Sequence, residues 1–401
     1  MNARSDSTVG SRLFAHAGLA AAGVLIFQMA VMTSGRIVAG DGLGWDGRGY
    51  ARLMAEGLDH ASEITRTRPL LPVLTRVPHA LGLDVIPSFQ VMNVLYAFTL
   101  YLFSVLILDA YGARMRVKAL VVANLALCVA TSKMFAYYPV QIDLGVLALV
   151  TAGVYFVMTD RHALAGVAGM LAMASREFGI VVVLCGLHRS FRRGRLWPDS
   201  AWYLPGVAVG LWVRWYTYSE GVLSANDALG NIALWRHPAF LGAFAYFTVT
   251  VFGGISALLV LQPRWCGRRL REQPELASYL LLIVALTALG NLDVWRYLVF
   301  ALPVTLILFA QYSERVPLPE TLIAAAVTFV TVITQRPFQR MDQDLYFQDW
   351  FPLYGIISDT PPPWQFLALW GVRLTTLSLL LIALLLIRPL RPRLHEQASS
   401  S

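Results

Sequence analysis

Charged side chains gather in short stretches of an otherwise apolar chain, and the first of these is GWDGRGYARLMAEG at 44–57. Its carboxylates and guanidinium groups suit two kinds of chemistry. A carboxylate in a partly desolvated site can act as a general base towards a hydroxyl group. Arginine can stabilise the charge of a departing phosphate. Asp46 directly precedes an apolar pattern, and Asp is favoured at N-caps, so the alternative is that Asp46 only caps a helix.

A second charged stretch, TRTRPLLPVLTRVPHALGL at 65–83, begins with Arg66 and Arg68. Thr67 can cap a helix here, and Pro69 suits its first turn. Helix N-termini favour anions, and two guanidinium groups beside a helix N-terminus would complete a phosphate-binding site. The stretch therefore predicts phosphate binding. The alternative is a contact with lipid headgroups that has no catalytic role.

Further ionisable residues lie beside apolar segments in three pairs: Lys133 with Asp143, Arg176 with Glu177, and Asp293 with Arg296. Charged groups this close to hydrocarbon are costly, so they pair with one another or line a water-filled site. Each pair therefore marks either a structural salt bridge or part of a polar site.

An acidic and aromatic stretch, RMDQDLYFQDWFPLYG, covers 340–355 and contains Asp342, Asp344 and Asp349. Interfacial aromatic residues anchor loops at the level of lipid headgroups. Aromatic and acidic side chains together also suit sugar binding. Two Asp residues in a DxD pattern rarely define a metal site by themselves. His60, His79 and His237, in the polar segments, do not have the spacing of metal ligands. We therefore expect no structural metal.

The elements that position these residues must be membrane helices. The chain has 401 residues, of which 57% are hydrophobic and only 14% are charged, whereas a soluble domain carries about 25% charged residues. The apolar residues form long blocks, and backbone polar groups in a bilayer must pair internally, so the blocks are predicted to be helices. The net charge of +8 is typical of basic cytoplasmic loops, and we expect no nucleic-acid partner.

Eleven apolar blocks can be counted, at 13–33, 85–108, 119–136, 141–158, 163–187, 201–218, 240–261, 276–290, 297–312, 319–335 and 364–387. Four basic segments favour the cytoplasm, at 114–118, 188–195, 263–272 and 388–395. They share one side only if block 163–187 splits at SREF into half-helices at 163–174 and 178–190. The alternative is one continuous helix with an internal Arg–Glu pair. The split predicts about twelve membrane-spanning helices, within eleven to thirteen, with both termini in the cytoplasm.

The longer polar regions, 34–84, 219–239 and 336–362, then all lie outside. Within the first of them, Tyr50, Leu53, Met54 and Leu58 follow a helical period and predict an amphipathic helix in the membrane interface. A second such helix is predicted within 65–83. We expect one transmembrane domain over 1–401 with no separate soluble domain.

The stretches WDGRGYARLMAEG, RPLLPVLTR, ASREFGIVV, NLDVWRYLVFALP and DQDLYFQDWFPLY together resemble bacterial members of the GT-C superfamily of polytopic glycosyltransferases. The resemblance covers most of the chain as topology and about sixty residues as loose motifs. It implies a GT-C-like fold in the bacterial cytoplasmic (inner) membrane. It also implies transfer of a hexose or pentose from a polyprenyl-phosphate donor to a glycan, lipid or protein acceptor on the external face, with inversion at the anomeric carbon.

The resemblance also implies roles for individual residues. Members of the superfamily carry an acidic residue in the first external loop, close to where the sugar meets its acceptor. That role falls on Asp46 as general base, with Asp41 as second choice. The candidates for binding the donor phosphate are Arg68, Arg176, Arg296 and Lys133. The candidates for orienting the substrate are Glu177, Asp293, Asp342, Asp344 and Asp349. No cofactor is required by these residues, although assistance from a divalent cation is left open.

A transporter or lipid flippase is the main alternative, because twelve helices with both ends inside is a common transporter layout. The predicted charges cluster on one face, whereas a transport pathway would place them near the midplane. A transferase or ligase acting on membrane-anchored glycans, and a structural partner of an export complex, are further alternatives.

Overall fold

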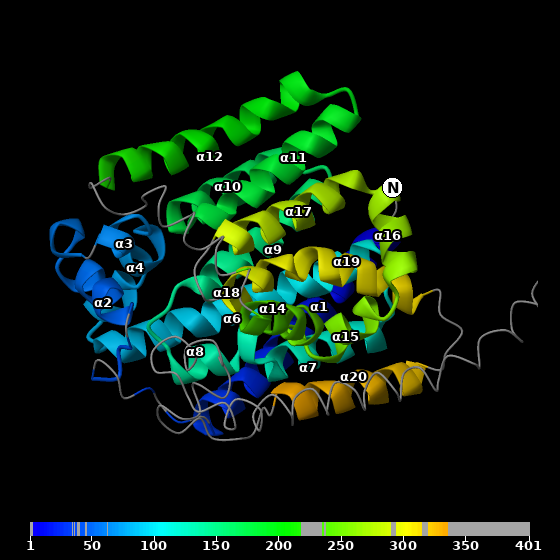
Figure 1. Cartoon of the computed structure of the whole chain (residues 1–401), viewed down its shortest axis with the longest axis horizontal. Helices are drawn as coiled ribbons and strands as arrows, with labels where there is room; N and C mark the ends of the chain where they lie inside the picture. Colours follow the sequence, from blue (N-terminus) through cyan, green and yellow to red (C-terminus); the bar gives the residue numbers. More distant parts are fainter. Residues whose placement is uncertain are drawn as a thin grey trace, which may run out of the picture.

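The described part of the chain is all-helical, with no β-strand among its residues (Figure 1). The structure is a computed structural model, and it describes residues 3–33, 35, 37, 41–44, 46–61, 63–217, 235, 238–289, 294–314 and 320–335. The last predicted membrane helix, 364–387, and the predicted last external loop, 336–362, lie outside these residues.

The helices before residue 140 are α1 (Ala3–Thr33), α2 (Gly47–Ala55), η1 (Leu58–His60), α3 (Glu63–Arg66), α4 (Leu70–Leu74), α5 (Arg76–Ala80), α6 (Val85–Ala110), α7 (Met115–Leu127), η2 (Val129–Thr131) and α8 (Lys133–Tyr137). The later helices are α9 (Asp143–Met158), α10 (His162–Ser175), η3 (Glu177–Gly179), α11 (Ile180–Arg192), α12 (Leu196–Thr217), α14 (Pro238–Thr250), α15 (Gly254–Val260), α16 (Pro263–Glu272), α17 (Pro274–Leu289), α18 (Val294–Leu298), η4 (Val299–Ala301), α19 (Leu302–Ser313) and α20 (Glu320–Gln335).

The long helices run between two ends of a bundle, with α2 to α4 at the left end and α16 at the right end of Figure 1. Basic segments meet at the right end. Arg114 lies 3.8 Å from Glu314, Arg189 lies 3.1 Å from Glu275, and α16 packs on α17. Three of the four predicted cytoplasmic segments are thereby gathered at one end: 114–118, 188–195 and 263–272. The fourth, 388–395, lies outside the described residues.

The predicted split of block 163–187 is confirmed, because helix α10 ends at Ser175 and α11 begins at Ile180. The two helices form an antiparallel hairpin. Gly179 lies against the backbone of Met173, and a Cβ on Gly169 would lie 3.5 Å from Val182. The half-helices have 14 and 13 residues, or about 20 Å each at 1.5 Å per residue. The tip of this hairpin carries Arg176 and Glu177.

Helix α12 covers the hairpin along the top of Figure 1. Its 22 residues correspond to about 33 Å. Aromatic side chains point away from the bundle near both of its ends, with Trp197 87% exposed and Trp215 78% exposed.

Two apolar blocks that read as single helices are broken, which corrects the sequence-based prediction. Block 119–136 ends its helix at Leu127 and continues through η2 into the short α8. Block 240–261 breaks between α14 and α15, where Gly253 has φ 54°. The Gly254 N–H donates to Thr331 Oγ1 at 3.0 Å. A side chain from α20 therefore satisfies a backbone group that the break releases.

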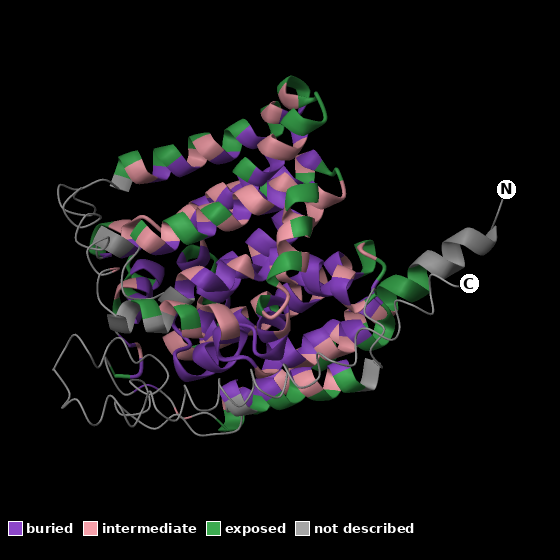
Figure 2. Ribbon diagram, turned by 45° about the vertical axis from the view of Figure 1, so that its right-hand side comes forward, coloured by how far each residue is buried: buried purple, intermediate pink, exposed green. Residues whose placement is uncertain are grey.

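Three of the described helices are long and apolar enough to cross a membrane: Gly10–Thr33 within α1, Val85–Ala110, and Arg296–Ser313 across α18 to α19. A fourth is added if α16 and α17, between which the chain bends by 116°, count as one bent span. Buried residues concentrate in the middle of the bundle and exposed ones along its rim (Figure 2). The described part of the chain is therefore all-helical with three or four candidate membrane spans.

The first predicted amphipathic helix is present as α2, whereas Leu58 of the predicted pattern begins η1. The apolar side of α2, Tyr50, Leu53 and Met54, is at most 1% exposed, so that side packs on the protein and not on a membrane interface. The second prediction was wrong in detail. The stretch 65–83 forms α3 and the five-residue helices α4 and α5. One continuous helix does not form, because Pro72 and Pro78 lack the N–H groups that it would use. Val77 and Leu81 of the predicted apolar side are 62% and 82% exposed.

Candidate functional site

The centre of the candidate site is a buried carboxylate between two arginines. Asp143 is the first residue of α9 and its side chain is 1% exposed. Arg296 of α18 donates to Asp143 Oδ2 from Nη2 at 2.8 Å and from Nε at 3.0 Å. Arg176, at the tip of the α10–α11 hairpin, contacts the other oxygen, Oδ1. Two cations compensate the cost of burying this carboxylate.

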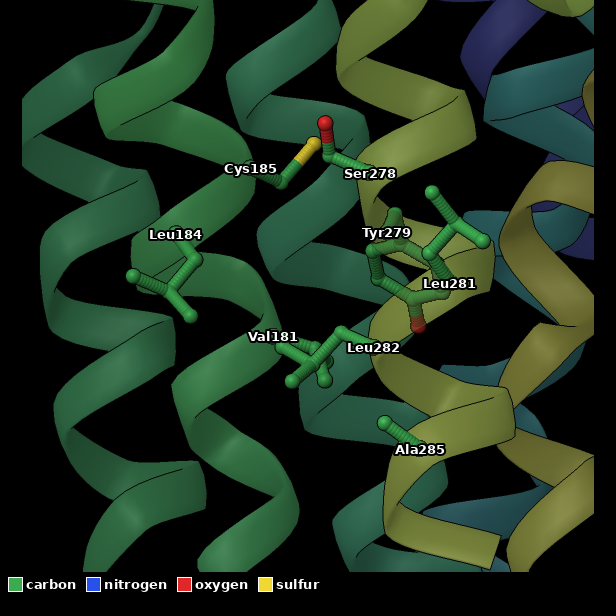
Figure 3. Close-up of a pocket in the computed structure, with 8 residues that line it drawn as sticks. All are labelled: Val181, Leu184, Cys185, Ser278, Tyr279, Leu281, Leu282 and Ala285. Atoms are coloured by element: carbon green, nitrogen blue, oxygen red, sulfur yellow. The ribbon is translucent and has the colours of Figure 1, made fainter. Parts of the chain in front are cut away.

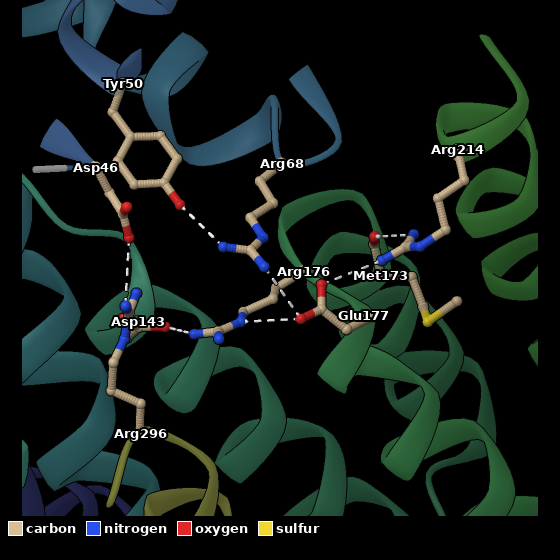
Figure 4. Close-up of polar contacts among 9 residues, drawn as sticks. All are labelled: Asp46, Tyr50, Arg68, Asp143, Met173, Arg176, Glu177, Arg214 and Arg296. Atoms are coloured by element: carbon tan, nitrogen blue, oxygen red, sulfur yellow. Dashed lines mark hydrogen bonds and ion pairs between the residues drawn. The ribbon is translucent and has the colours of Figure 1, made fainter. Parts of the chain in front are cut away.

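Asp46 lies at the edge of this group, where Arg296 links it to Asp143 (Figure 4). The distance from Arg296 Nη1 to Asp46 Oδ2 is 3.3 Å, and the Asp46 side chain is 37% exposed. Asp46 occupies the N-cap position of α2, but its side chain makes no capping hydrogen bond. The interpretation that Asp46 only caps a helix is therefore wrong, because its carboxylate faces the arginine instead.

Close backbone packing on Tyr138 positions the turn that carries Asp46. Gly44 has φ 73°, and a Cβ at this position would overlap the Tyr138 ring. Gly47 donates its backbone N–H to the Tyr138 hydroxyl at 2.8 Å. The glycines around Asp46 are thus explained by approach of the chain to an aromatic ring, which leaves no room for side chains.

Glu177 forms a second centre, where three arginines surround one carboxylate. The nearest distances to Glu177 are 3.2 Å from Arg176, 3.3 Å from Arg68 and 3.6 Å from Arg214. Burial alone would raise the pKa of this carboxyl group. The charges of Arg68 and Arg176 outweigh that effect and lower the pKa to about 2. Glu177 therefore remains ionised and serves to hold the arginines in place.

Two of these arginines are also held by neutral partners. Arg68 Nη1 donates to the Tyr50 hydroxyl at 3.3 Å, and Arg214 Nη1 donates to the Gly210 carbonyl at 3.1 Å. Arg68 Nε and Arg214 Nη2 have no hydrogen-bond acceptor among the described residues. Buried donors without acceptors are uncommon in native proteins, and one explanation for them is a bound water or ion.

Aromatic rings cover the deepest arginine. Arg176 is 2% exposed, and its guanidinium carbon lies 5.3 Å from the Phe178 ring centre and 5.5 Å from that of Tyr297. Phe178 in turn stacks on Phe300 with ring centres 4.3 Å apart. The ring faces attract the cation and exclude water from its charge, which holds Arg176 rigidly at the hairpin tip.

The charges of the described residues of the cluster do not balance. These residues include the four arginines Arg68, Arg176, Arg214 and Arg296, and the three carboxylates Asp46, Asp143 and Glu177. Among the described residues, four positive and three negative charges leave an excess of one positive charge in a partly buried place. Such an excess attracts an anion, and arginine suits phosphate in particular.

The structure brings together five of the predicted site residues: Asp46, Arg68, Arg176, Glu177 and Arg296. Asp41 is elsewhere, because its side chain is 95% exposed and lies 3.6 Å from Arg48 on the surface. Arg66 is also elsewhere and donates to the carbonyls of Asp59 and Ala61.

Lys133 is fully buried at the start of α8, and it is not among the described contacts of this cluster. The predicted partner of Asp143 was Lys133, whereas in the structure Asp143 pairs with Arg176 and Arg296. Asp293, Asp342, Asp344 and Asp349 lie outside the described residues. No group of three or more His, Cys, Asp or Glu side chains in the described part of the chain could hold a metal ion.

Asp143, Arg214 and Tyr50 are the members that sequence reasoning did not assign to the site. Asp143 was noted only as a partner for Lys133, and Tyr50 only for its apolar side. Arg214 stands near the end of an apolar block in the run WVRWYT. An arginine inside a predicted span is itself a signal of function, and that signal could have identified it.

Comparison of the chain with protein-family models, with curated protein sequences and with solved structures gives no match.

Proposed function

We propose that this protein is a membrane glycosyltransferase that moves a sugar from a polyprenyl-phosphate donor to an acceptor hydroxyl group. The donor phosphate binds beside Arg68 and Arg214, and Asp46 acts as the general base. The observation that carries the proposal is the contrast between two partly exposed carboxylates, Asp46 and Glu177, in the same arginine cluster. Asp46 contacts one described arginine, whereas Glu177 contacts three.

This contrast assigns different roles to the two carboxylates. A base must reach the substrate and must be able to accept a proton. Asp143 is ruled out as a base by its burial, and Glu177 by the arginines that lower its pKa to about 2. Asp46 has an exposed edge and a single described guanidinium partner, and it is the remaining carboxylate of the cluster.

The proposed reaction is a single displacement. The acceptor oxygen forms a bond to the anomeric carbon while the bond from that carbon to the phosphate oxygen breaks. The hydroxyl proton passes to the Asp46 carboxylate, and polyprenyl phosphate leaves with the electron pair. Arg68 Nε and Arg214 Nη2, which have no hydrogen-bond acceptor among the described residues, stabilise the charge that develops on the phosphate. One displacement inverts the configuration of the sugar.

The proposed setting is a twelve-span protein in the cytoplasmic membrane with its site on the external side. Support comes from the alternation of consecutive helices between the two ends of the bundle. Helix α9 begins at Asp143 in the site and ends at Met158, whose carbonyl accepts from Arg189 at the basic end. Helix α10 returns to Arg176, α11 leads back to Arg189, and α12 returns to Arg214.

The test compares Asp46→Asn with Asp41→Asn as a matched control in the same loop. Polyprenyl-phosphate hexose and pentose, labelled in the sugar, are supplied to the protein in lipid nanodiscs together with membranes from its own host cells. We expect Asp46→Asn to lower transfer by about 10²- to 10⁴-fold, the usual contribution of a general base, with donor binding retained. Asp41→Asn should transfer like the wild type. Full activity in Asp46→Asn would refute the base assignment.

A transporter or lipid flippase is the second candidate, and the two broken helices favour it. Interrupted helices with satisfied backbone groups are typical of transporter binding sites. Here Asn124 donates to the Phe252 carbonyl at 3.0 Å, and Gln335 donates to the Thr250 carbonyl at 2.6 Å. Movement of the labelled lipid across a proteoliposome membrane without any sugar transfer would support this candidate over the first.

A further inference from the structure

An apolar groove lies between α11 and α17 (Figure 3). Its volume is about 370 Å³, within the range of about 300–1,000 Å³ that small-molecule sites occupy. Hydrocarbon side chains form most of its walls, with Val181 and Leu184 from α11 and Leu281, Leu282 and Ala285 from α17. Nothing charged lines it among the described residues, so an aqueous solute is a poor occupant.

The groove opens sideways, towards the apolar surroundings of the bundle. Leu184 on one wall is 44% exposed and Leu281 on the other is 70% exposed. A hydrocarbon chain can therefore enter from the lipid phase without crossing the protein interior. A single groove of this size receives one chain, whereas a phospholipid brings two.

One end of the groove adjoins the arginine cluster. Val181 comes two residues after the turn that carries Glu177. On the opposite wall Tyr279 lies between the two ends of the groove, and its ring points towards the Val181 end (Figure 3). Its hydroxyl donates to the Phe300 carbonyl at 2.6 Å, and Phe300 belongs to the aromatic stack under Arg176. The wall of the groove thus continues into the surface that holds the guanidinium group.

At the other end of the groove, none of the described lining residues has a polar group in need of a partner. Ser278 lies there beside Cys185. The Ser278 hydroxyl donates to the Pro274 carbonyl at 3.0 Å and lies 2.8 Å from His188 Nδ1. An occupant therefore needs its anionic group at the cluster end and apolar atoms everywhere else.

We infer that this groove holds the single hydrocarbon chain of a lipid phosphate whose headgroup binds at the arginine cluster. The inference rests on the proposed function and adds the path of the lipid carrier along the protein. It assigns the lipid-phosphate carrier to the side of the bundle formed by α11 and α17.

The test fills the groove with Ala285→Trp and uses Val284→Trp as its control. Val284 is 42% exposed on the same helix and does not line the groove. Binding of polyprenyl phosphate and of methyl phosphate, which has no chain to enter the groove, is measured in nanodiscs. We expect Ala285→Trp to weaken polyprenyl phosphate at least about tenfold, because each methylene kept from burial costs about fourfold. Binding of methyl phosphate should not change, and Val284→Trp should behave like the wild type.

The outcomes separate this inference from the proposed function. If the wild type does not bind polyprenyl phosphate, both the proposed function and the groove inference are refuted. If it binds and Ala285→Trp binds equally well, only the groove is refuted. An equal loss in Val284→Trp, or equally tight binding of two-chain phosphatidic acid, would also refute it. A polyprenyl phosphate with a diazirine in its chain provides a second test on the wild type. Crosslinks are expected on α11 and α17, and crosslinks confined to other helices would overturn the inference.

Discussion

Asp46, Asp143 and Glu177 are three carboxylates within one network, and their surroundings give them three different properties. Asp143 is enclosed by two arginines and is 1% exposed. Glu177 is partly exposed but contacts three arginines, which hold it ionised. Asp46 keeps an open edge. Differences of this kind between neighbouring titratable groups separate structural from chemical roles in active sites.

The low pKa of Glu177 predicts how stability depends on pH. Its ordinary value is 4.5 and its value in the folded protein is about 2. A depressed carboxyl pKa contributes stability that is present above the unfolded value and is lost as pH falls through the folded value. We therefore expect the thermal midpoint of the wild type in detergent to decrease between pH 4.5 and 2.

Glu177→Gln is the matching variant for that measurement, because it removes the titrating group and keeps the shape of the side chain. Its thermal midpoint should be lower than that of the wild type at neutral pH and should change less over the same acidic range. Identical pH profiles for the two proteins would show that Glu177 does not stabilise the hairpin tip through its charge.

At the scale of elements, the α10–α11 hairpin decides whether the site exists. Its tip presents Arg176 and Glu177 to residues from the first loop, α9, α12 and α18. A continuous helix through this block would point the two side chains along its flank instead. The turn is possible because Gly179 lies directly against the backbone of α10, at Ala172 and Met173.

Gly179→Ala should therefore disturb the site without changing any charged residue. The added Cβ would overlap backbone atoms, which cannot move as a flexible side chain can. Overpacking of this kind costs about 1–3 kcal/mol. We expect a lower thermal midpoint together with weaker binding of methyl phosphate. Gly267→Ala on α16 is the control, because a Cβ there meets nothing within 4 Å. Equal behaviour of the two variants would contradict this account of the hairpin.

At the scale of the whole molecule, the two ends of the bundle carry different charges. The basic segments gather at one end, and the cluster with its acidic partners lies at the other. In a membrane protein the basic end faces the cytoplasm. The structure therefore leads to a prediction about sidedness that needs no knowledge of the substrate.

Single cysteines at the two ends test this prediction in intact cells. Cys266, which is partly exposed, is first replaced by Ser. Arg193→Cys, where the side chain is 45% exposed at the basic end, should react with a membrane-impermeant maleimide only after the cells are opened. His60→Cys, where the side chain is 64% exposed at the site end, should react from outside. Labelling of both positions from the same side would refute the proposed membrane topology.

The helical class, the hairpin tip and five members of the cluster can be predicted from the sequence alone. These features follow from local signals, because long apolar runs must be helices and charged residues within them must be paired. Local sequence marks both the break at Gly253 and Gly254 and the break at SREF, 175–178. Only the second is predicted, because it alone is needed to place the basic loops on one side of the membrane.

The tertiary structure decided which charges meet. Asp143 and Arg296 are 153 residues apart, and Arg296 and Asp46 are 250 residues apart. Spacing along the sequence does not identify which arginine at this end of the bundle pairs with Asp143 and Asp46. Pairing over such separations depends on the order in which helices pack and on which side of each helix faces inward. Those are collective properties of the folded chain, and they placed Asp41 on the surface and Asp46 in the site.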